Sequence, residues 1–190
     1  MGSYNKRFGI ICTDLAKLHH AGTPRGMTSV CSAHPLVLRA ALQHGRDTAS
    51  SVLIEATCNQ VNHEGGYTGM QPTDFVALVR DAAAEAGLPE EQLLLGGDHL
   101  GPQPWRNLDA ETAMTKAEAM VEAYVRAGFK KIHLDASMAC GGEPNPTFEQ
   151  IAERAADLCE VAETYAPDPS ELIYIIGTEV PIPGGETEEP

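Results

Sequence analysis

The stretch Leu93–Trp105, LLLGGDHLGPQPW, sets out the plan of this chain. Its apolar beginning predicts a buried strand over residues 92–96, closed by a Gly-Gly pair. That strand would deliver Asp98 and His99 into a loop rich in glycine and proline. A carboxylate and an imidazole at the carboxyl end of a strand stand where α/β folds place ligands and chemistry. The alternative is a polar turn in which Asp98 caps the loop and His99 is solvated.

The same unit, a strand followed by a helix, recurs along the chain. We predict four further strands, over residues 28–32, 52–57, 131–135 and 172–177. Helices are predicted after the first four strands, over residues 34–43, 72–86, 109–127 and 147–165. Strands that alternate with helices of about ten to twenty residues predict an α/β fold with a parallel sheet.

Five such units leave two architectures open. One is an open five-stranded sheet, and the other is the first five units of a TIM-type (β/α) barrel, which takes about 250 residues. We favour the partial barrel, because a fifth strand without a crossover helix leaves apolar surface exposed. Residues 1–27 are predicted to be an N-terminal preface with a short helix over 6–20, and residues 28–190 an incomplete β/α barrel domain.

Composition limits the classes of partner. The 190 residues carry a net charge of −14, which disfavours binding to nucleic acid or to an anionic membrane. No apolar run approaches the roughly 18 residues of a membrane span, and the N-terminus lacks the apolar centre of a signal peptide. We therefore expect a cytoplasmic protein.

The five cysteines form no CxxC pair and are odd in number, which indicates free thiols. Cys31 and Cys58 lie in apolar strand-like runs, where we expect them to be buried. Cys140 follows a strand in a glycine-rich loop, where it could be exposed. Nothing in the sequence around Cys140 predicts a low pKa, so a functional thiol there is disfavoured.

Polar side chains are expected at the carboxyl end of every predicted strand. Because parallel strands end at the same face, residues far apart in sequence could share one site there. Carboxylates and imidazoles suit a divalent metal such as Zn²⁺. We take Asn59, Asp135 and Ser137 as candidates for binding a substrate. The whole set is Ser32, His34, Glu55, Thr57, Asn59, Asn62, Asp98, His99, Asp135, Ser137, Thr178 and Glu179.

Two polar residues inside strands also have a structural interpretation. For His133, a satisfied core or inter-layer histidine is favoured over a metal ligand. Glu55 lies in an apolar strand, which is costly unless its carboxylate is paired or faces a polar barrel interior. The sequence contains no GxGxxG opening a helix, no GxxxxGK loop and no nucleophile elbow.

Four runs of the sequence resemble one known family. The runs are SVCSAHPLVLRAAL (29–42), LIEATCNQVNHEGGYTGMQPTDF (53–75), LLLGGDHLGPQPW (93–105) and KIHLDASMACGGEP (131–144). Together they resemble the Z-type accessory subunit of D-tagatose-1,6-bisphosphate aldolase, over residues 28 to about 186. The resemblance implies a longer protein of which this chain is an N-terminal part. It also implies a non-catalytic subunit that supports the stability and activity of a catalytic aldolase partner in galactitol or N-acetylgalactosamine breakdown.

The Z-type subunit is in turn similar to the class II aldolases, which are zinc-dependent barrels. That similarity implies that Asp98 is a catalytic acid/base and that His99 and Glu179 are zinc ligands. Glu186, which follows Gly184-Gly185, would abstract a proton. The implied chemistry is polarisation of the carbonyl of a ketose phosphate by zinc and stabilisation of an enediolate.

The class II pattern takes further zinc histidines and phosphate loops from later strands. A zinc site needs about three protein ligands, so we expect this chain alone neither to hold zinc tightly nor to cleave a sugar bisphosphate. The alternative to an accessory role is an enzyme in its own right. It would be a metal-dependent aldolase or sugar-phosphate isomerising protein that uses Asp98, His99 and Glu179.

Overall fold

The structure is a computed structural model that describes residue 15 and residues 17–23 and 26–176. Strands and helices alternate as the sequence predicts. The strands are β1 (Ser29–Cys31), β2 (Val52–Thr57), β3 (Leu93–Leu100), β4 (Lys131–Leu134) and β5 (Ile173–Ile176). The helices are α2 (Pro35–Thr48), α3 (Pro72–Ala86), α4 (Ala110–Ala127) and α5 (Phe148–Tyr165). Short 3₁₀ turns lie at η1 (Glu90–Gln92), η2 (Gln103–Trp105) and η3 (Pro169–Glu171).

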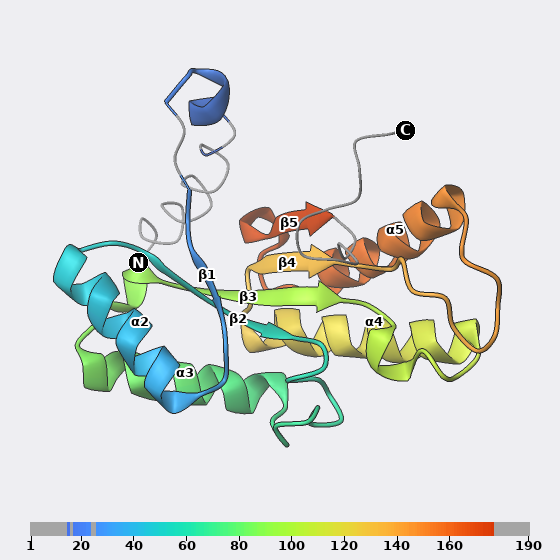
Figure 1. Cartoon of the computed structure of the whole chain (residues 1–190), viewed down its shortest axis with the longest axis horizontal. Coiled ribbons are helices and arrows are strands. Elements are labelled where there is room, and N and C mark those ends of the chain that lie inside the picture. The colour runs from blue at the N-terminus through green and yellow to red at the C-terminus, as the bar shows by residue number, and fades with distance from the viewer. Residues whose placement is uncertain (1–14, 16, 24–25, 177–190) are drawn as a thin grey trace, which may run out of the picture.

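The five strands form one parallel sheet in the order β1-β2-β3-β4-β5 (Figure 1). Each strand pairs with the next one along the chain, and crossovers between parallel strands are right-handed in nearly all proteins. The helices therefore follow one another over a single face of the sheet, where α2 packs on α3, α3 on α4, and α4 on α5. In a doubly wound fold the strand order reverses and helices cover both faces. In the described residues the strand order does not reverse, so this part of the fold is not doubly wound.

The main core lies between the helices and the sheet. Alternate strand residues such as Ile54, Leu95 and Ile132 pack there with Phe75 and Tyr124 from the helices. The residues between them point to the opposite face, which we call the inner face, because strand side chains alternate. On the inner face a separate small cluster of Leu53, Leu94 and Met27 contains no helical residue.

Most helix ends follow from local sequence. Asp109 caps α4 by accepting the amide of Thr112, and Thr147 forms a capping box with Gln150 at the start of α5. Gly128 ends α4 in the left-handed conformation, as the sequence predicts.

Helix α2 is longer than predicted. The expectation that it ends near residue 43 was wrong, because the helix continues through Gly45 to Thr48. Gly45 is kept within the helix by close packing: a Cβ there would lie 2.1 Å from Cγ2 of Val52. The glycine thus serves contact between α2 and β2 rather than ending the helix.

Some expectations concern the chain ends. Residues 17–20 are helical, while the remainder of the helix predicted over 6–20 lies almost wholly outside the described residues. The division at residue 27 stays a prediction. Within the described part, no helix combines the length and apolarity that a membrane crossing requires.

Candidate functional site

Strand β3 carries Asp98 and His99 within the strand rather than after it. The prediction that this strand ends at residue 96 was wrong, because a bulge continues it. The pairing of β3 with β4 shifts register between Gly97 and Leu100, and His99 has a φ of 50°. In a regular strand, consecutive side chains point to opposite faces. The bulge and the left-handed residue redirect the chain, so that both side chains reach the inner face.

His99 has a positive φ, and this backbone conformation costs free energy for any residue with a Cβ. We therefore expect backbone strain at this position. We expect His99→Gly to be more stable than His99→Ala by about 1 kcal/mol, because glycine adopts the left-handed region without steric cost. Chemical denaturation of both variants measures the difference. Ala49, which ends α2 with a φ of 49°, provides the matched control, since Ala49→Gly should stabilise by a similar amount. An alanine variant at 99 as stable as the glycine variant would contradict the argument.

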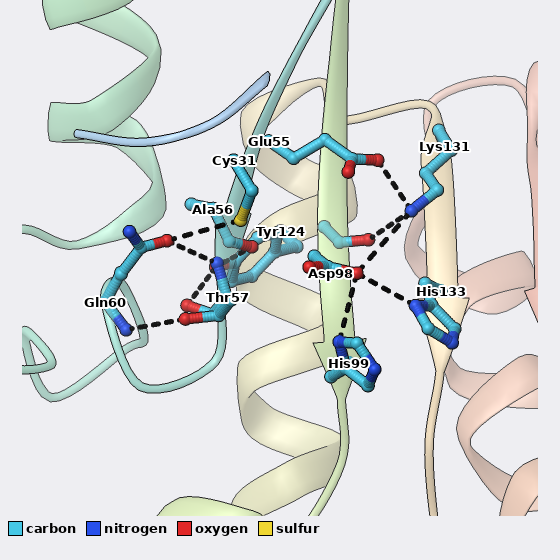
Figure 2. A network of polar contacts seen from close by, with 11 residues as sticks. Cys31, Glu55, Ala56, Thr57, Gln60, Asp98, His99, Tyr124, Lys131 and His133 are labelled. Carbon is cyan, nitrogen blue, oxygen red and sulfur yellow. Dashed lines mark hydrogen bonds and ion pairs between the residues drawn. The ribbon is translucent and has the colours of Figure 1, made fainter. Parts of the chain in front are cut away.

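Asp98 gathers two imidazoles around one oxygen. Its Oδ1 lies 2.9 Å from Nδ1 of His133 on β4 and 3.1 Å from Nδ1 of His99 (Figure 2). The two rings are 4.3 Å apart between centroids. All three side chains are partly buried, and one donor atom from each lies within 4.8 Å of the others. They form the Asp98-His99-His133 cluster, the one group of three possible metal ligands found among the described residues.

The surroundings keep Asp98 ionised. The hydrogen bond with His133 holds the pKa of the Asp98 carboxyl well below its ordinary value. Partial burial opposes this, while the nearby His99 and Lys131 reinforce it. An ionised carboxylate is the form that orients imidazoles and coordinates cations.

His133 is a candidate site residue that the sequence analysis did not select. Its ring is largely buried and satisfied by Asp98, as an interior histidine is expected to be, but it lies on the inner face beside His99. A signal was present in the alternation along β4. Lys131, His133 and Asp135 alternate with the buried Ile132 and Leu134, which is the pattern of a strand with one polar face.

Glu55 is buried and paired, as one of the two readings of the sequence required. Its Oε1 lies 2.6 Å from Nζ of Lys131, and the side chains are 3% and 10% exposed. Lys131 also lies 3.9 Å from Oδ1 of Asp98. A charged pair therefore adjoins the Asp98-His99-His133 cluster on the inner face.

Asp135 and Ser137 lie together just beyond β4. Oδ1 of Asp135 accepts hydrogen bonds from the amide of Ser137 at 3.0 Å and from its hydroxyl at 2.6 Å. Oδ2 of Asp135 is buried and has no hydrogen-bond partner among the described residues. Buried acceptors of this kind are satisfied by water, an ion or a ligand.

Asn59 lies in the loop after β2 and is exposed. Its carbonyl accepts the amide of Tyr67 within that loop. The loop is fixed to the rest of the fold by Glu64, which accepts from Nε1 of Trp105 at 2.8 Å and pairs with Lys116. The structure thus holds Asn59 on an anchored loop, and among the described residues no hydrogen bond or ion pair joins Asn59 to Asp98 or His99.

Two residues from the class II pattern, Glu179 and Glu186, lie outside the described residues. So does Thr178, the other polar residue predicted after the last strand. Their roles stay predictions.

The cysteine expectations were only partly right. Cys58 is buried as predicted, but Cys31 is exposed and Cys140 is buried. β1 lies at the edge of the sheet, so its Cys31 has a neighbouring strand on one side only. Cys140 is 1% exposed because its loop folds back, with the amide of Cys140 donating to Glu143 at 2.8 Å.

Cys31 is expected to react slowly despite its exposure. Desolvation by neighbouring chain atoms, reinforced by the Asp98 carboxylate, raises the pKa of the Cys31 thiol to about 12. Since the thiolate is the nucleophile, iodoacetamide should modify Cys31 at pH 8 roughly 1,000-fold more slowly than a free thiol, or slower still. The rate should rise steadily as pH increases towards 11. Mass spectrometry of timed samples checks this, and a rate at pH 8 equal to that of a free cysteine would refute it.

Comparison with known proteins identifies the relatives of this fold and site. Residues 12–190 match the family model described as D-tagatose-1,6-bisphosphate aldolase subunit GatZ/KbaZ-like. The chain belongs to this family. The resemblance drawn from the four sequence runs is thereby confirmed.

Relatives of this GatZ/KbaZ-like chain carry two kinds of name. The chain is 61% identical over 178 residues to a D-tagatose 6-phosphate 4-epimerase of Agrobacterium fabrum, covering 92% of this chain and 42% of the relative. It is 57% identical over 171 residues to a D-tagatose-1,6-bisphosphate aldolase subunit GatZ of Escherichia coli O8, covering 88% and 41%. The chain therefore spans about two fifths of the length of these relatives.

A solved structure is similar to the GatZ/KbaZ-like chain in both sequence and fold. It is the crystal structure of a probable tagatose 6 phosphate kinase from Sinorhizobium meliloti 1021. The TM-score is 0.77 at 54% identity, over 82% of this chain and 39% of the other. The present sequence contains no GxxxxGK phosphate loop of the kind that binds nucleotides in many kinases.

Proposed function

We propose that this chain is part of a non-catalytic accessory subunit of a class II D-tagatose-1,6-bisphosphate aldolase. In that role it supports the stability and activity of the catalytic subunit in galactitol or N-acetylgalactosamine breakdown. The observation that carries the proposal is the family match over residues 12–190. Relatives that are 54–57% identical and named as GatZ subunits support it.

The proposal includes a TIM-type barrel for the whole protein, of which the described residues form the first five β/α units. The sequential strand order and the single layer of helices support this, because barrels are wound in one direction. Polar residues at the strand ends of the inner face fit the same plan. The carboxyl ends of barrel strands are where such proteins place their sites.

The test is to mix the purified protein with the catalytic aldolase subunit. We expect no cleavage of D-tagatose 1,6-bisphosphate by the protein alone. We expect a higher rate or melting temperature of the partner on mixing. His99→Ala should retain this support, because a purely accessory role assigns no chemistry to the imidazole. Cleavage by the protein alone, lost in His99→Ala, would overturn the accessory role.

A second candidate is an enzyme that isomerises a sugar phosphate or cleaves it with a metal ion. The relative named D-tagatose 6-phosphate 4-epimerase, at 61% identity, favours it. The Asp98-His99-His133 cluster also favours it, since an accessory role by itself requires no such constellation.

The cluster fits a divalent cation by its chemistry. One carboxylate and two imidazoles are a donor set that Zn²⁺ accepts, with three protein ligands and a position left for substrate. When bound, zinc would act as a Lewis acid on a carbonyl oxygen. The sequence alone provided one histidine and one carboxylate as metal ligands. His133 of β4 adds a third ligand.

In this candidate function Asp98, which the sequence analysis proposed as the acid/base, would be the third metal ligand instead. The other residues keep the roles predicted from sequence. Asn59, Asp135 and Ser137 would bind substrate hydroxyl groups, and the unpartnered Oδ2 of Asp135 supports such a role. Glu179 and Glu186 stay proposals as metal ligand and proton acceptor. The substrate would be a ketose phosphate.

Besides the cleavage assay, an epimerisation assay separates the two candidates. The second predicts interconversion of D-tagatose 6-phosphate with its 4-epimer by the full-length protein alone, dependent on added Zn²⁺ or Co²⁺. Loss of that turnover in His99→Ala and His133→Ala would support it. Absence of both epimerisation and aldol cleavage at saturating metal would reject it.

A further inference from the structure

One row of paired residues runs across all five strands, with its side chains on the inner face. The paired positions are Cys31, Glu55, Gly96, Lys131 and Ile173, in strand order. Asp98 and His133 lie two residues further along β3 and β4, and therefore on the same face. Side chains at these two levels are neighbours.

Glu55 reaches across β3 to meet Lys131 of β4 (Figure 2). It can do so because β3 has a glycine between them. A Cβ at Gly96 would lie 2.7 Å from Oε1 and 2.9 Å from Cγ of Glu55. The absence of a side chain at Gly96 therefore gives Glu55 the room for its path across the strand.

Lys131 has two carboxylates within reach. Its Nζ lies 2.6 Å from Oε1 of Glu55, 3.4 Å from the carbonyl oxygen of Gly97 and 3.9 Å from Oδ1 of Asp98. The same Oδ1 of Asp98 contacts Nδ1 of both His133 and His99. The ammonium and the two imidazoles thus compete for one oxygen.

We propose that Glu55 is a positioning residue that holds the Lys131 ammonium away from Asp98 and so leaves Oδ1 of Asp98 to the two imidazoles. A buried ammonium without a counter-ion is costly, and a lysine side chain is flexible. Without the Glu55 carboxylate, Lys131 turns to Asp98, the other carboxylate within its reach. Asp98 then loses its contact with His133, and the cluster opens.

The first test follows the imidazoles themselves and needs no metal. In ¹⁵N NMR at one fixed pH above neutrality, Glu55→Gln should shift the Nδ1 signals of His133 and His99. Adding Lys131→Met to Glu55→Gln should return both signals towards the wild-type values, because the competing ammonium is gone. Unchanged signals in Glu55→Gln would overturn the proposal, and so would a double variant that stays shifted.

The matched control lies one residue away in the sequence. Lys130 pairs with Glu171 at 2.8 Å outside the cluster, so Glu171→Gln also removes a carboxylate from a lysine. It should leave both imidazole signals in place. Gly96→Ala is a second variant that changes no charge. It should push Glu55 aside and reproduce the shifts of Glu55→Gln, even if Glu55→Gln itself folds poorly.

A second readout rests on the metal site of the proposed function. Glu55→Gln should lower the affinity for Co²⁺ at least about 10-fold, as loss of groups that orient metal ligands does. The double variant Glu55→Gln with Lys131→Met should recover most of it. If the wild type bound no Co²⁺, the metal site would fail, while the NMR result would still decide the role of Glu55. If Co²⁺ bound equally well to Glu55→Gln, the role of Glu55 would be overturned although the metal site stands.

Discussion

His133→Ala is expected to weaken Co²⁺ binding at least about 100-fold. Removing groups that only orient metal ligands costs 10–100-fold, so loss of a ligand should cost at least the upper value. The variant leaves one imidazole and one carboxylate, which is fewer than the three protein ligands of a zinc site. Titration followed by the visible absorption of bound Co²⁺ measures the affinity directly.

His63→Ala is the matched control for that experiment. His63 is also partly buried, but its ring lies against Trp105 at 5.2 Å between centroids. Its removal should leave Co²⁺ affinity unchanged. Far-ultraviolet circular dichroism of both variants confirms that they are folded. Equal affinity in His133→Ala and wild type would remove His133 from the site.

Gly101→Ala is expected to destabilise the protein by about 3 kcal/mol or more. Gly101 follows β3, and a Cβ there would lie 1.7 Å from the backbone carbonyl oxygen of Asp135. Overpacking against side chains typically costs 1–3 kcal/mol, and a backbone carbonyl cannot move aside as a side chain can. For a chain of this length, the melting temperature should fall by roughly 6–12 °C.

Gly26→Ala controls for the general effect of adding a methyl group. A Cβ at Gly26 meets no atom within 4 Å, so its melting temperature should stay near that of the wild type. A small loss for Gly101→Ala, equal to that of Gly26→Ala, would show that β3 and β4 do not approach as closely as described. The close approach also fixes the position of Asp135 relative to Asp98. The variant therefore tests how the backbone holds these two site residues together.

Local sequence was sufficient for the order of strands and helices. Apolar runs such as residues 52–57 mark the buried strands, and the caps at Asp109 and Thr147 mark helix starts, because these signals act within a few residues. The end of α2 was missed because Gly45 serves a close contact with Val52 of β2, which exists only once the chain has turned back after the helix and is not a local sequence signal.

The site was only half visible for the same reason. Asp98 and His99 stood out as a pair, but the bulge that turns both to the inner face depends on pairing with β4. His133 acquires its role only when β4 lies beside β3. Glu55 read as costly until Lys131, 76 positions further along the chain, supplied its counter-ion. Burial of Cys140 likewise depends on how its loop folds, which composition does not encode.

The most direct test of the Asp98-His99-His133 metal site is anomalous X-ray diffraction from crystals of the wild-type protein grown with Zn²⁺. We expect an anomalous peak at about 2.0–2.2 Å from a ring nitrogen of His99, a ring nitrogen of His133 and a carboxylate oxygen of Asp98. No peak at this position under saturating Zn²⁺, or a peak that touches only one of the two histidines, would contradict it.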